Sequence, residues 1–224
     1  MPKLDDYHHF GGRHWETGSV HNHWAYRRFL APHTQQPYSE ALLMGISGGI
    51  VMGYFSFAYQ GYDPHVAILT RNTFDPLETL YDRLALPREV LHTSDPKKGE
   101  ANLLEALEGG KPAIIWADMF SLPYYAYPEV SQMWAMMPVV VHGVENGSAF
   151  LADRSNLPIK VAMETLTHAR SIIKKDKFRV MTLDAPDLSR LPAAVSKGIW
   201  QCISLFVEAP PKGAKNNFGL AALD

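Results

Sequence analysis

Apolar side chains recur at roughly helical spacing near the start of the chain, which predicts a first helix. A glycine pair at positions 11 and 12 permits a sharp backbone turn before it. We expect the helix to open at residues 13–16, to be capped by Thr17 or Ser19, and to carry on its apolar side Val20, Trp24, Phe29 and Leu30. A helix N-terminus stabilises anions, so the opening residues are candidates for chemistry.

Helix-like and strand-like patterns alternate along the rest of the chain. Further helices are expected at residues 39–47, 73–84, 100–107, 163–174 and 188–206, with glycine pairs ending the first and third of these. Strands are expected at residues 50–59, 65–70, 89–92, 112–117, 138–144, 148–153 and 178–183. The run at 50–59 is expected to be a buried strand or a hairpin arm, and to pair with the strand at 65–70. A Tyr/Pro-rich loop through Tyr127 can pack over the core or wall a small-molecule pocket.

The strongest local signal is the Asn146-Gly147 pair between two apolar runs. Both residues tolerate the positive φ angles of a two-residue hairpin turn. The strands at 138–144 and 148–153 are therefore expected to pair directly and in antiparallel orientation.

Composition narrows the class of protein. The 224 residues are 46% hydrophobic and 20% charged with a net charge of −2, values that are ordinary for one globular domain. No basic cluster with interleaved aromatics indicates a nucleic-acid partner, and no apolar run approaches a membrane span. The opening residues lack the apolar stretch of a secretory signal, so the cytoplasm is the expected location. We expect one domain at residues 1–208 and a linker, or the start of a further domain, at 209–224.

Cys202 is the only cysteine, which excludes an internal disulfide, a zinc site built of thiolates and a CxxC redox pair. Its apolar neighbours predict a small buried side chain rather than a reactive thiol.

Half of the ten histidines fall in the first helix and the segment before it, at positions 8, 9, 14, 21 and 23. With Glu16 they invite a metal site. His21 and His23, however, are two residues apart and point to opposite sides of a helix, whereas ligands on one face are spaced by three or four. No metal or cofactor is therefore expected. Histidine and aromatic side chains at the start of a helix are as often a polar layer that covers a hydrophobic core.

Four short motifs carry a resemblance to a known family. They are GRHWET at residues 12–17, SEAL at 39–42, GISGGI at 45–50 and ADR at 152–154. Their order resembles the N-terminal domain of butirosin biosynthesis protein H, a papain-like acyltransferase family that moves an acyl group from a carrier protein to an amine. The resemblance implies an α+β, papain-like fold, with an N-terminal helix packed on a mostly antiparallel sheet. It also implies a cysteine opening the first helix, and a histidine and an acidic residue on consecutive later strands.

The chain departs from that pattern at two of the three catalytic positions. Trp15 stands where the family has its nucleophilic cysteine, and an indole is not a nucleophile. Met137 and Pro138 stand at the strand start that carries the histidine. The nearest histidine, His142, is four residues further along, or ~13 Å in a strand. Asp153 matches the acidic residue.

Two interpretations follow. In the first, the chain has no catalytic cysteine and binds a small molecule or an acyl carrier protein within a biosynthetic pathway. In the second, it is an active acyltransferase or amide hydrolase that uses the histidine-rich helix start, with Thr17 or Ser19 as a hydroxyl nucleophile or with a metal. The sequence leaves open whether the chain is an enzyme. Candidate catalytic residues are His14, Glu16 and Asp153, and candidate binding residues are Arg13, Trp15, Thr17, His21, His142 and Arg154.

These candidates lead to a geometric expectation. Trp15 should be at least partly buried and lie on the same site as Asp153. His14 should come within hydrogen-bonding reach of Asp153 or Glu16.

Overall fold

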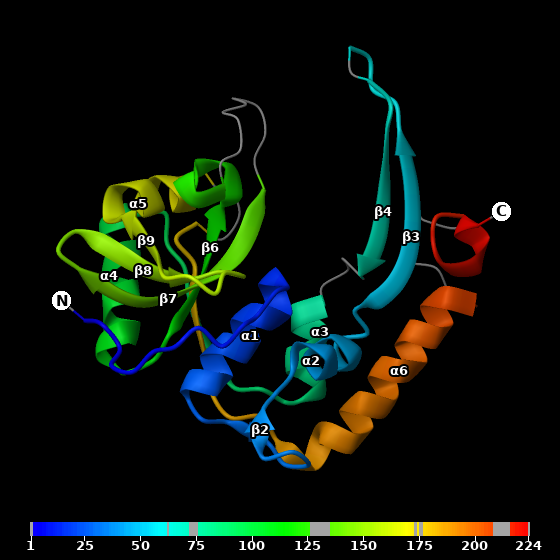
Figure 1. Ribbon diagram of the computed structural model, residues 1–224, viewed down its shortest axis with the longest axis horizontal. Coiled ribbons are helices and arrows are strands. Elements are labelled where there is room, and N and C mark those ends of the chain that lie inside the picture. Colours follow the sequence, from blue (N-terminus) through cyan, green and yellow to red (C-terminus); the bar gives the residue numbers. More distant parts are fainter. Residues whose placement is uncertain are drawn as a thin grey trace. The chain divides into compact units, whose positions relative to one another are not determined.

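The computed structural model describes residues 2–61, 63–71, 76–125, 135–172, 174, 177–207 and 216–223. The chain forms two compact units, each built from two separate stretches of sequence (Figure 1). The first unit comprises Met1–Glu40 and Pro87–Ala185, and the second comprises Ala41–Leu86 and Pro186–Asp224. No helix in the described ranges is long and apolar enough to cross a membrane.

A six-stranded sheet with the order β5-β10-β6-β7-β8-β9 forms the centre of the first unit. Every neighbouring pair in it is antiparallel. Its strands are β5 (Arg88–Leu91), β6 (Ala113–Asp118), β7 (Met136–Glu145), β8 (Ser148–Ala152), β9 (Ile159–Ala162) and β10 (Val180–Leu183). The helices of this unit are α1 (Trp15–Tyr26), α4 (Pro96–Glu108) and α5 (Met163–Ser171), with the short 3-10 helices η1 (Met119–Ser121) and η2 (Pro123–Tyr125).

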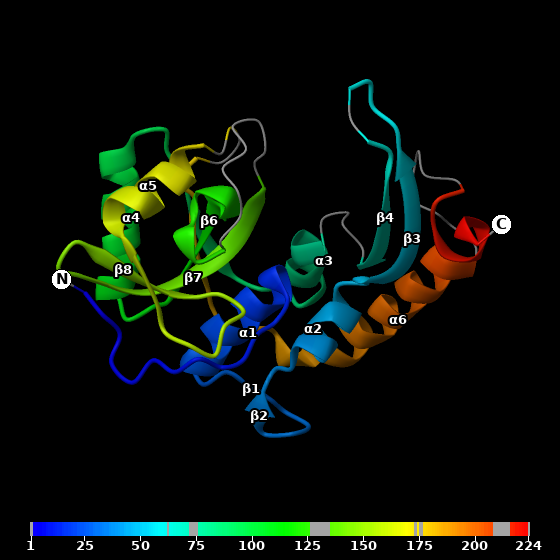
Figure 2. The ribbon, with the colours of Figure 1, turned by 45° about the horizontal axis from the view of Figure 1, so that its top comes forward.

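The two faces of this sheet are covered by different helices (Figure 2). Side chains alternate along a strand, so Ala113, Ile115 and Ala117 of β6 share one face, where they pack in one core with Leu103 of α4 and Leu166 of α5. Helix α1 contacts β7, β6 and β10. The expected α+β class, with the N-terminal helix packed on an antiparallel sheet, is confirmed.

Helix α1 is shorter than expected, and its cap is a different residue. His14 is the N-cap, with its side chain accepting from the Thr17 N–H, so neither Thr17 nor Ser19 caps the helix. The helix ends at Tyr26 because Arg28 adopts a left-handed φ of 57°. The N–H groups of Arg28 and Phe29 then bond back to the last turn, the Schellman arrangement. Phe29 and Leu30 therefore lie outside the helix, and Leu30–Ala31 (β1) pairs with Gln36–Pro37 (β2).

The hairpin of β7 and β8 is confirmed. Asn146 and Gly147 have φ angles of 49° and 71°, as a two-residue turn of this kind requires. The register shifts by one residue at His142, which forms a β-bulge: Val141 lies opposite Leu151, but Gly143 lies opposite Phe150. Asp153 follows β8 directly.

Several boundaries in this unit differ from the expectation. Strands β1, β2 and β9 are not anticipated by the sequence pattern, because two to four residues are too few for a period to show. Helix α4 begins earlier than expected because the Asp95 carboxylate accepts from the N–H groups of Lys97 and Lys98, with Pro96 in the first turn. Helix α5 ends at Ser171, short of the expected residue 174.

The second unit contains α2 (Glu40–Ile46, of which Glu40 belongs to the first unit), α3 (Pro76–Arg83), α6 (Leu191–Val207), η3 (Leu188–Arg190), η4 (Gly219–Ala222) and the antiparallel hairpin of β3 (Ile50–Phe57) and β4 (His65–Arg71). The start expected for the helix at 73–84 lies outside the described residues. The hairpin pairs as expected but is buried only in part: Val51 is 3% exposed, whereas the cross-strand neighbours Tyr54 and Ile68 are 40% and 65% exposed. Cys202 is likewise only partly buried, not fully buried as expected.

Candidate functional site

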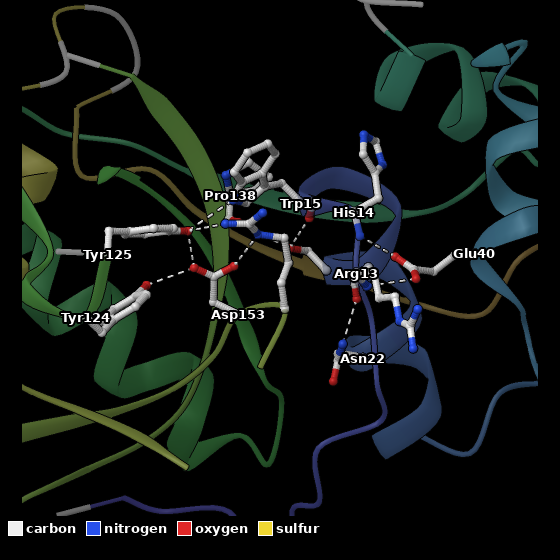
Figure 3. Close-up of polar contacts among 12 residues, drawn as sticks. Arg13, His14, Trp15, Asn22, Glu40, Tyr124, Tyr125, Pro138 and Asp153 are labelled. Atoms are coloured by element: carbon white, nitrogen blue, oxygen red, sulfur yellow. Dashed lines mark hydrogen bonds and ion pairs between the residues drawn. The ribbon is translucent and has the colours of Figure 1, made fainter. Parts of the chain in front are cut away.

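The start of α1 is held by contacts among its own first residues. The His14 ring accepts from the Thr17 N–H at Nδ1, and the same nitrogen lies 2.9 Å from the Thr17 hydroxyl. On its other side, His14 Nε2 lies 3.5 Å from the Glu16 carboxylate. Of the two partners expected for His14, Glu16 is the one observed; in Figure 3 the imidazole points away from Asp153.

The backbone before α1 is fixed by a carboxylate and by two close approaches. Glu40 accepts from the N–H groups of Arg13 at 2.8 Å and His14 at 2.9 Å. A Cβ on Gly12 would lie 2.7 Å from the Asn22 amide and 2.8 Å from the Cα of Gly18. Glycine is therefore required at position 12 to let the chain pass this close to the helix.

Trp15, the first residue of α1, is connected to Asp153 through a tyrosine. The indole Nε1 donates to the Tyr125 hydroxyl at 3.1 Å, and that hydroxyl donates to the Asp153 carboxylate. Tyr124 donates to the same carboxylate oxygen at 2.9 Å. Figure 3 shows the two tyrosines converging on Asp153 from one side. Trp15 is partly buried, as expected.

Arg154 completes this group from the other side. Its guanidinium lies 3.7 Å from the centroid of the Trp15 ring, a cation–π contact, and its Nε lies 3.4 Å from Asp153. Its Nη2 donates to the Tyr125 hydroxyl at 3.3 Å. Arg154 has a φ of 44°, a left-handed conformation that costs free energy in a residue with a Cβ. The contacts of the guanidinium compensate for this cost. Trp15, Tyr124, Tyr125, Asp153 and Arg154 are called the Trp15–Asp153 cluster below.

The electrostatics of the cluster follow from burial. The Asp153 side chain is almost wholly buried, and such a carboxylate needs donors. Burial, followed by the charge of Asp153, raises the pKa of Tyr124. Burial and the hydrogen bond to Asp153 likewise raise the pKa of Tyr125. Both phenols therefore stay protonated at neutral pH and act as donors to the carboxylate.

The start of β7 lies beside the first turns of α1. The Ser19 hydroxyl donates to the Trp15 carbonyl at 2.6 Å and lies 3.5 Å from the carbonyl of Pro138. Figure 3 shows Pro138 next to Trp15. The strand start where the sequence resemblance places a catalytic histidine is thus adjacent to Trp15, and it carries Met137 and Pro138, neither of which can act as a base.

Two expected binding residues lie elsewhere. The two ring nitrogens of His21 lie 2.6 Å from the Tyr38 carbonyl and 2.8 Å from the Phe10 carbonyl, so this side chain joins the N-terminal segment to the chain after β2. His142 stacks on Tyr7 with ring centroids 4.1 Å apart, at the bulge of β7. Burial, and then the charges of His9 and Lys3, lower the pKa of His142 to about 4. Neither side chain has a contact that joins it to the Trp15–Asp153 cluster within the described residues.

The remaining histidines of α1 do not form a metal centre. His23 is fully buried, and its Nε2 accepts from the Leu183 N–H at 3.2 Å. Burial, with the charges of Arg27 and Lys111, lowers the pKa of His23 to about 3 and keeps the ring neutral. In the described part of the chain, no three His, Cys, Asp or Glu side chains converge on a point that could hold a metal ion.

Sequence reasoning missed three residues of this region. Tyr124 and Tyr125 were expected only in a loop over the core or a pocket, because nothing in a Tyr/Pro run reveals a distant carboxylate partner. Glu40 was expected only as part of a helix start. The sequence feature that could have identified Glu40 is the SEAL motif at residues 39–42, since the carboxylate of this motif bonds the turn before α1.

Comparisons with known proteins bear on this arrangement. No curated protein matches the chain. The family model described as butirosin biosynthesis protein H, N-terminal, matches residues 14–154. That stretch is well over half of the 224 residues and runs from the N-cap of α1 to Arg154. The chain therefore belongs to the butirosin biosynthesis protein H N-terminal family.

Proposed function

We propose that this chain is a papain-like domain, related to acyltransferases that act between an acyl carrier and an amine, that lacks the catalytic cysteine and serves a biosynthetic pathway by binding. The proposal rests on the residues found at the start of α1 and after β8. An indole, that of Trp15, stands at the first position of α1, and the Asp153 carboxylate is bonded by two tyrosines and an arginine.

The arrangement of elements supports the papain-like part of the proposal. In a papain-like enzyme the nucleophile opens a helix packed on an antiparallel sheet, with the base and its orienting acid on adjacent strands. Here Trp15 opens α1, Pro138 lies near the start of the neighbouring strand β7, and Asp153 directly follows the paired strand β8. The three positions share one region, but neither of the first two can take part in acyl transfer.

The competing function is a hydrolase or transferase built on the start of α1. The Thr17 hydroxyl, the His14 ring and the Glu16 carboxylate lie in the order that a hydroxyl nucleophile requires. Thr17 is only 2% exposed, however, and the same His14 nitrogen accepts from the backbone N–H of Thr17. A buried hydroxyl facing a helix cap is not accessible to a substrate, so binding is the better supported function.

The chemistry of the cluster indicates an anionic ligand. The Arg154 side chain is 30% exposed and presents its guanidinium over the Trp15 ring. Arginine is suited to carboxylates and phosphates, and the nearby N-terminus of α1 also favours negative charge. The phosphopantetheine arm of an acyl carrier protein combines a phosphate with an acyl thioester. It is the ligand we propose.

Acetyl-phosphopantetheine is the probe that tests the proposal. Calorimetric titration should show binding that Arg154→Gln weakens about tenfold, the loss of one charge-assisted contact. Arg190→Gln, an exposed arginine of η3 in the second unit, should bind as the wild type does. Mass spectrometry with an added amine should show no acyl-protein and no amide product. Turnover that is abolished by Thr17→Val would instead establish the competing function. Absence of binding to the wild type would overturn the proposal.

A further inference from the structure

A cavity of about 230 Å³ lies between α4 and the sheet edge formed by β5 and β10. It opens on the face of the sheet that carries α4, because Val180, which lines it, belongs to the core shared with α4 and α5. It shares no residue with the Trp15–Asp153 cluster. A ligand here would therefore belong to a second site.

The cavity exists because small residues recur on one side of α4. Asn102, Ala106 and Gly109 line it at intervals of four and three residues, which places them on one side of the helix. Leu103 and Leu107 turn instead into the core. Apart from the exposed Glu105 side chain, this side of α4 carries only an amide, a methyl group and the capping glycine, and the gap above the strands remains open.

Two polar side chains in this cavity lack protein partners. Asn102 is 9% exposed and Thr182 is 4% exposed, and both line the cavity. Neither side chain makes a hydrogen bond with any described residue. An amide and a hydroxyl that face the same gap offer hydrogen-bond donors and acceptors to a small polar ligand.

Charges of both signs surround the same opening. Glu89 of β5 and Glu105 of α4 contribute carboxylates, and Lys111, just after α4, contributes an ammonium. None of the three forms an ion pair with another described residue. Leu91 and Val180, cross-strand partners, supply an apolar floor. The lining thus offers acceptors for a cation, a donor for an anion and a surface for a short aliphatic chain.

We propose that this cavity binds a small aliphatic α-amino acid. Its ammonium group would lie between Glu89 and Glu105, its carboxylate would face Lys111 and the Asn102 amide, and its side chain would pack on Leu91 and Val180. A cavity of about 230 Å³ has room for a molecule of that size. The proposal is independent of the proposed function, because the two sites have no residue in common.

The test uses three matched probes, L-norvaline, pentanoate and butylamine, which carry both charged groups, the acid alone and the amine alone. Protein-observed NMR titration of the full chain should show saturable shifts of the Asn102 side-chain amide and the Thr182 backbone amide with norvaline. Each single-charge analogue should bind about tenfold more weakly, since it loses one charge-assisted contact. Glu105→Gln should weaken norvaline binding by a similar factor.

Glu108→Gln is the matched control, because Glu108 is an exposed carboxylate of the same helix that does not line the cavity. Its norvaline affinity should equal that of the wild type. Ala106→Leu fills the cavity without adding charge and should abolish the shifts in a protein that still folds. The proposal is overturned if norvaline gives no saturable shift, if pentanoate or butylamine binds as tightly, or if Ala106→Leu binds norvaline normally.

Discussion

The guanidinium of Arg154 lies 3.7 Å from the centroid of the Trp15 indole. Trp15 is thus covered by Arg154, the residue that follows Asp153, and both side chains bond the Tyr125 hydroxyl. A cysteine at position 15 would leave this guanidinium without its aromatic platform. Trp15 and Arg154 therefore act as one unit, and substitution of either should change the other's contribution.

Truncation of Trp15 measures how much the indole supports the fold. Trp15 is partly buried, so Trp15→Ala should lower the free energy of unfolding by about 2 kcal/mol, less than the 3–5 kcal/mol of a fully buried tryptophan. Trp15→Phe keeps a ring for Arg154 but loses the hydrogen bond to Tyr125, and should cost about 1 kcal/mol. Urea denaturation checks both values. A cost below about 0.5 kcal/mol for the alanine variant would mean that the indole does not pack in the cluster.

Asp153→Asn tests the role of the buried carboxylate. The substitution removes the charge that Tyr124, Tyr125 and Arg154 share, and should cost about 2–3 kcal/mol of stability. Because the charge of Asp153 raises the pKa of both tyrosines, their pKa values should fall in the variant. Ultraviolet titration of tyrosinate formation measures the change in these two pKa values. Unchanged titration would show that burial alone sets the two pKa values.

Buried neutral histidines should make the fold sensitive to acid. The pKa of His23 is lowered to about 3, whereas in the unfolded chain it is about 6.5. Between these values the unfolded state binds the proton and the folded state does not, so stability falls as pH falls. From pH 7 to 5 the loss should be about 2 kcal/mol for His23. Urea denaturation of the wild type and of His23→Gln at both pH values measures this loss of stability. The free energy of unfolding of the variant should fall less between pH 7 and pH 5 than that of the wild type.

The turn between β7 and β8 should require glycine at position 147. Gly147 has a φ of 71°, so Gly147→Ala should destabilise the protein by about 1–2 kcal/mol. Gly109, which ends α4 with a φ of −74°, is the matched control, and Gly109→Ala should cost little. Thermal denaturation of the two variants compares them directly. Equal effects would show that the turn does not depend on the left-handed conformation.

Local rules anticipate much of the fold. Asn146-Gly147 predicted its hairpin because both residues act within the turn itself, and the glycine pairs at 48–49 and 109–110 marked helix ends for the same reason. The Trp15–Asp153 cluster was expected from the family motifs, since spacing alone does not bring together residues more than a hundred positions apart. Tyr124 and Tyr125 were not assigned to it, because a long-range hydrogen bond leaves no mark in a local pattern. The exposed face of the β3–β4 hairpin was misjudged because an apolar run indicates a strand but not what covers it.

A thiol introduced at position 15 tests the proposal that this domain lacks both a catalytic cysteine and the residues that would serve it. In a Cys202→Ser background, Trp15→Cys places a thiol at the first position of α1, where the helix N-terminus and Arg154 lower the pKa of a thiol. It should be alkylated by iodoacetamide faster than Cys202 is in the wild type. It should not transfer an acyl group to an amine, because Met137 and Pro138 supply no base and Asp153 is already bonded to tyrosines. Rates of alkylation by mass spectrometry, beside an acetyl-phosphopantetheine transfer assay, measure both properties. Acyl transfer by the cysteine variant alone would show that a second base is within reach, and His14 would then be the residue to replace.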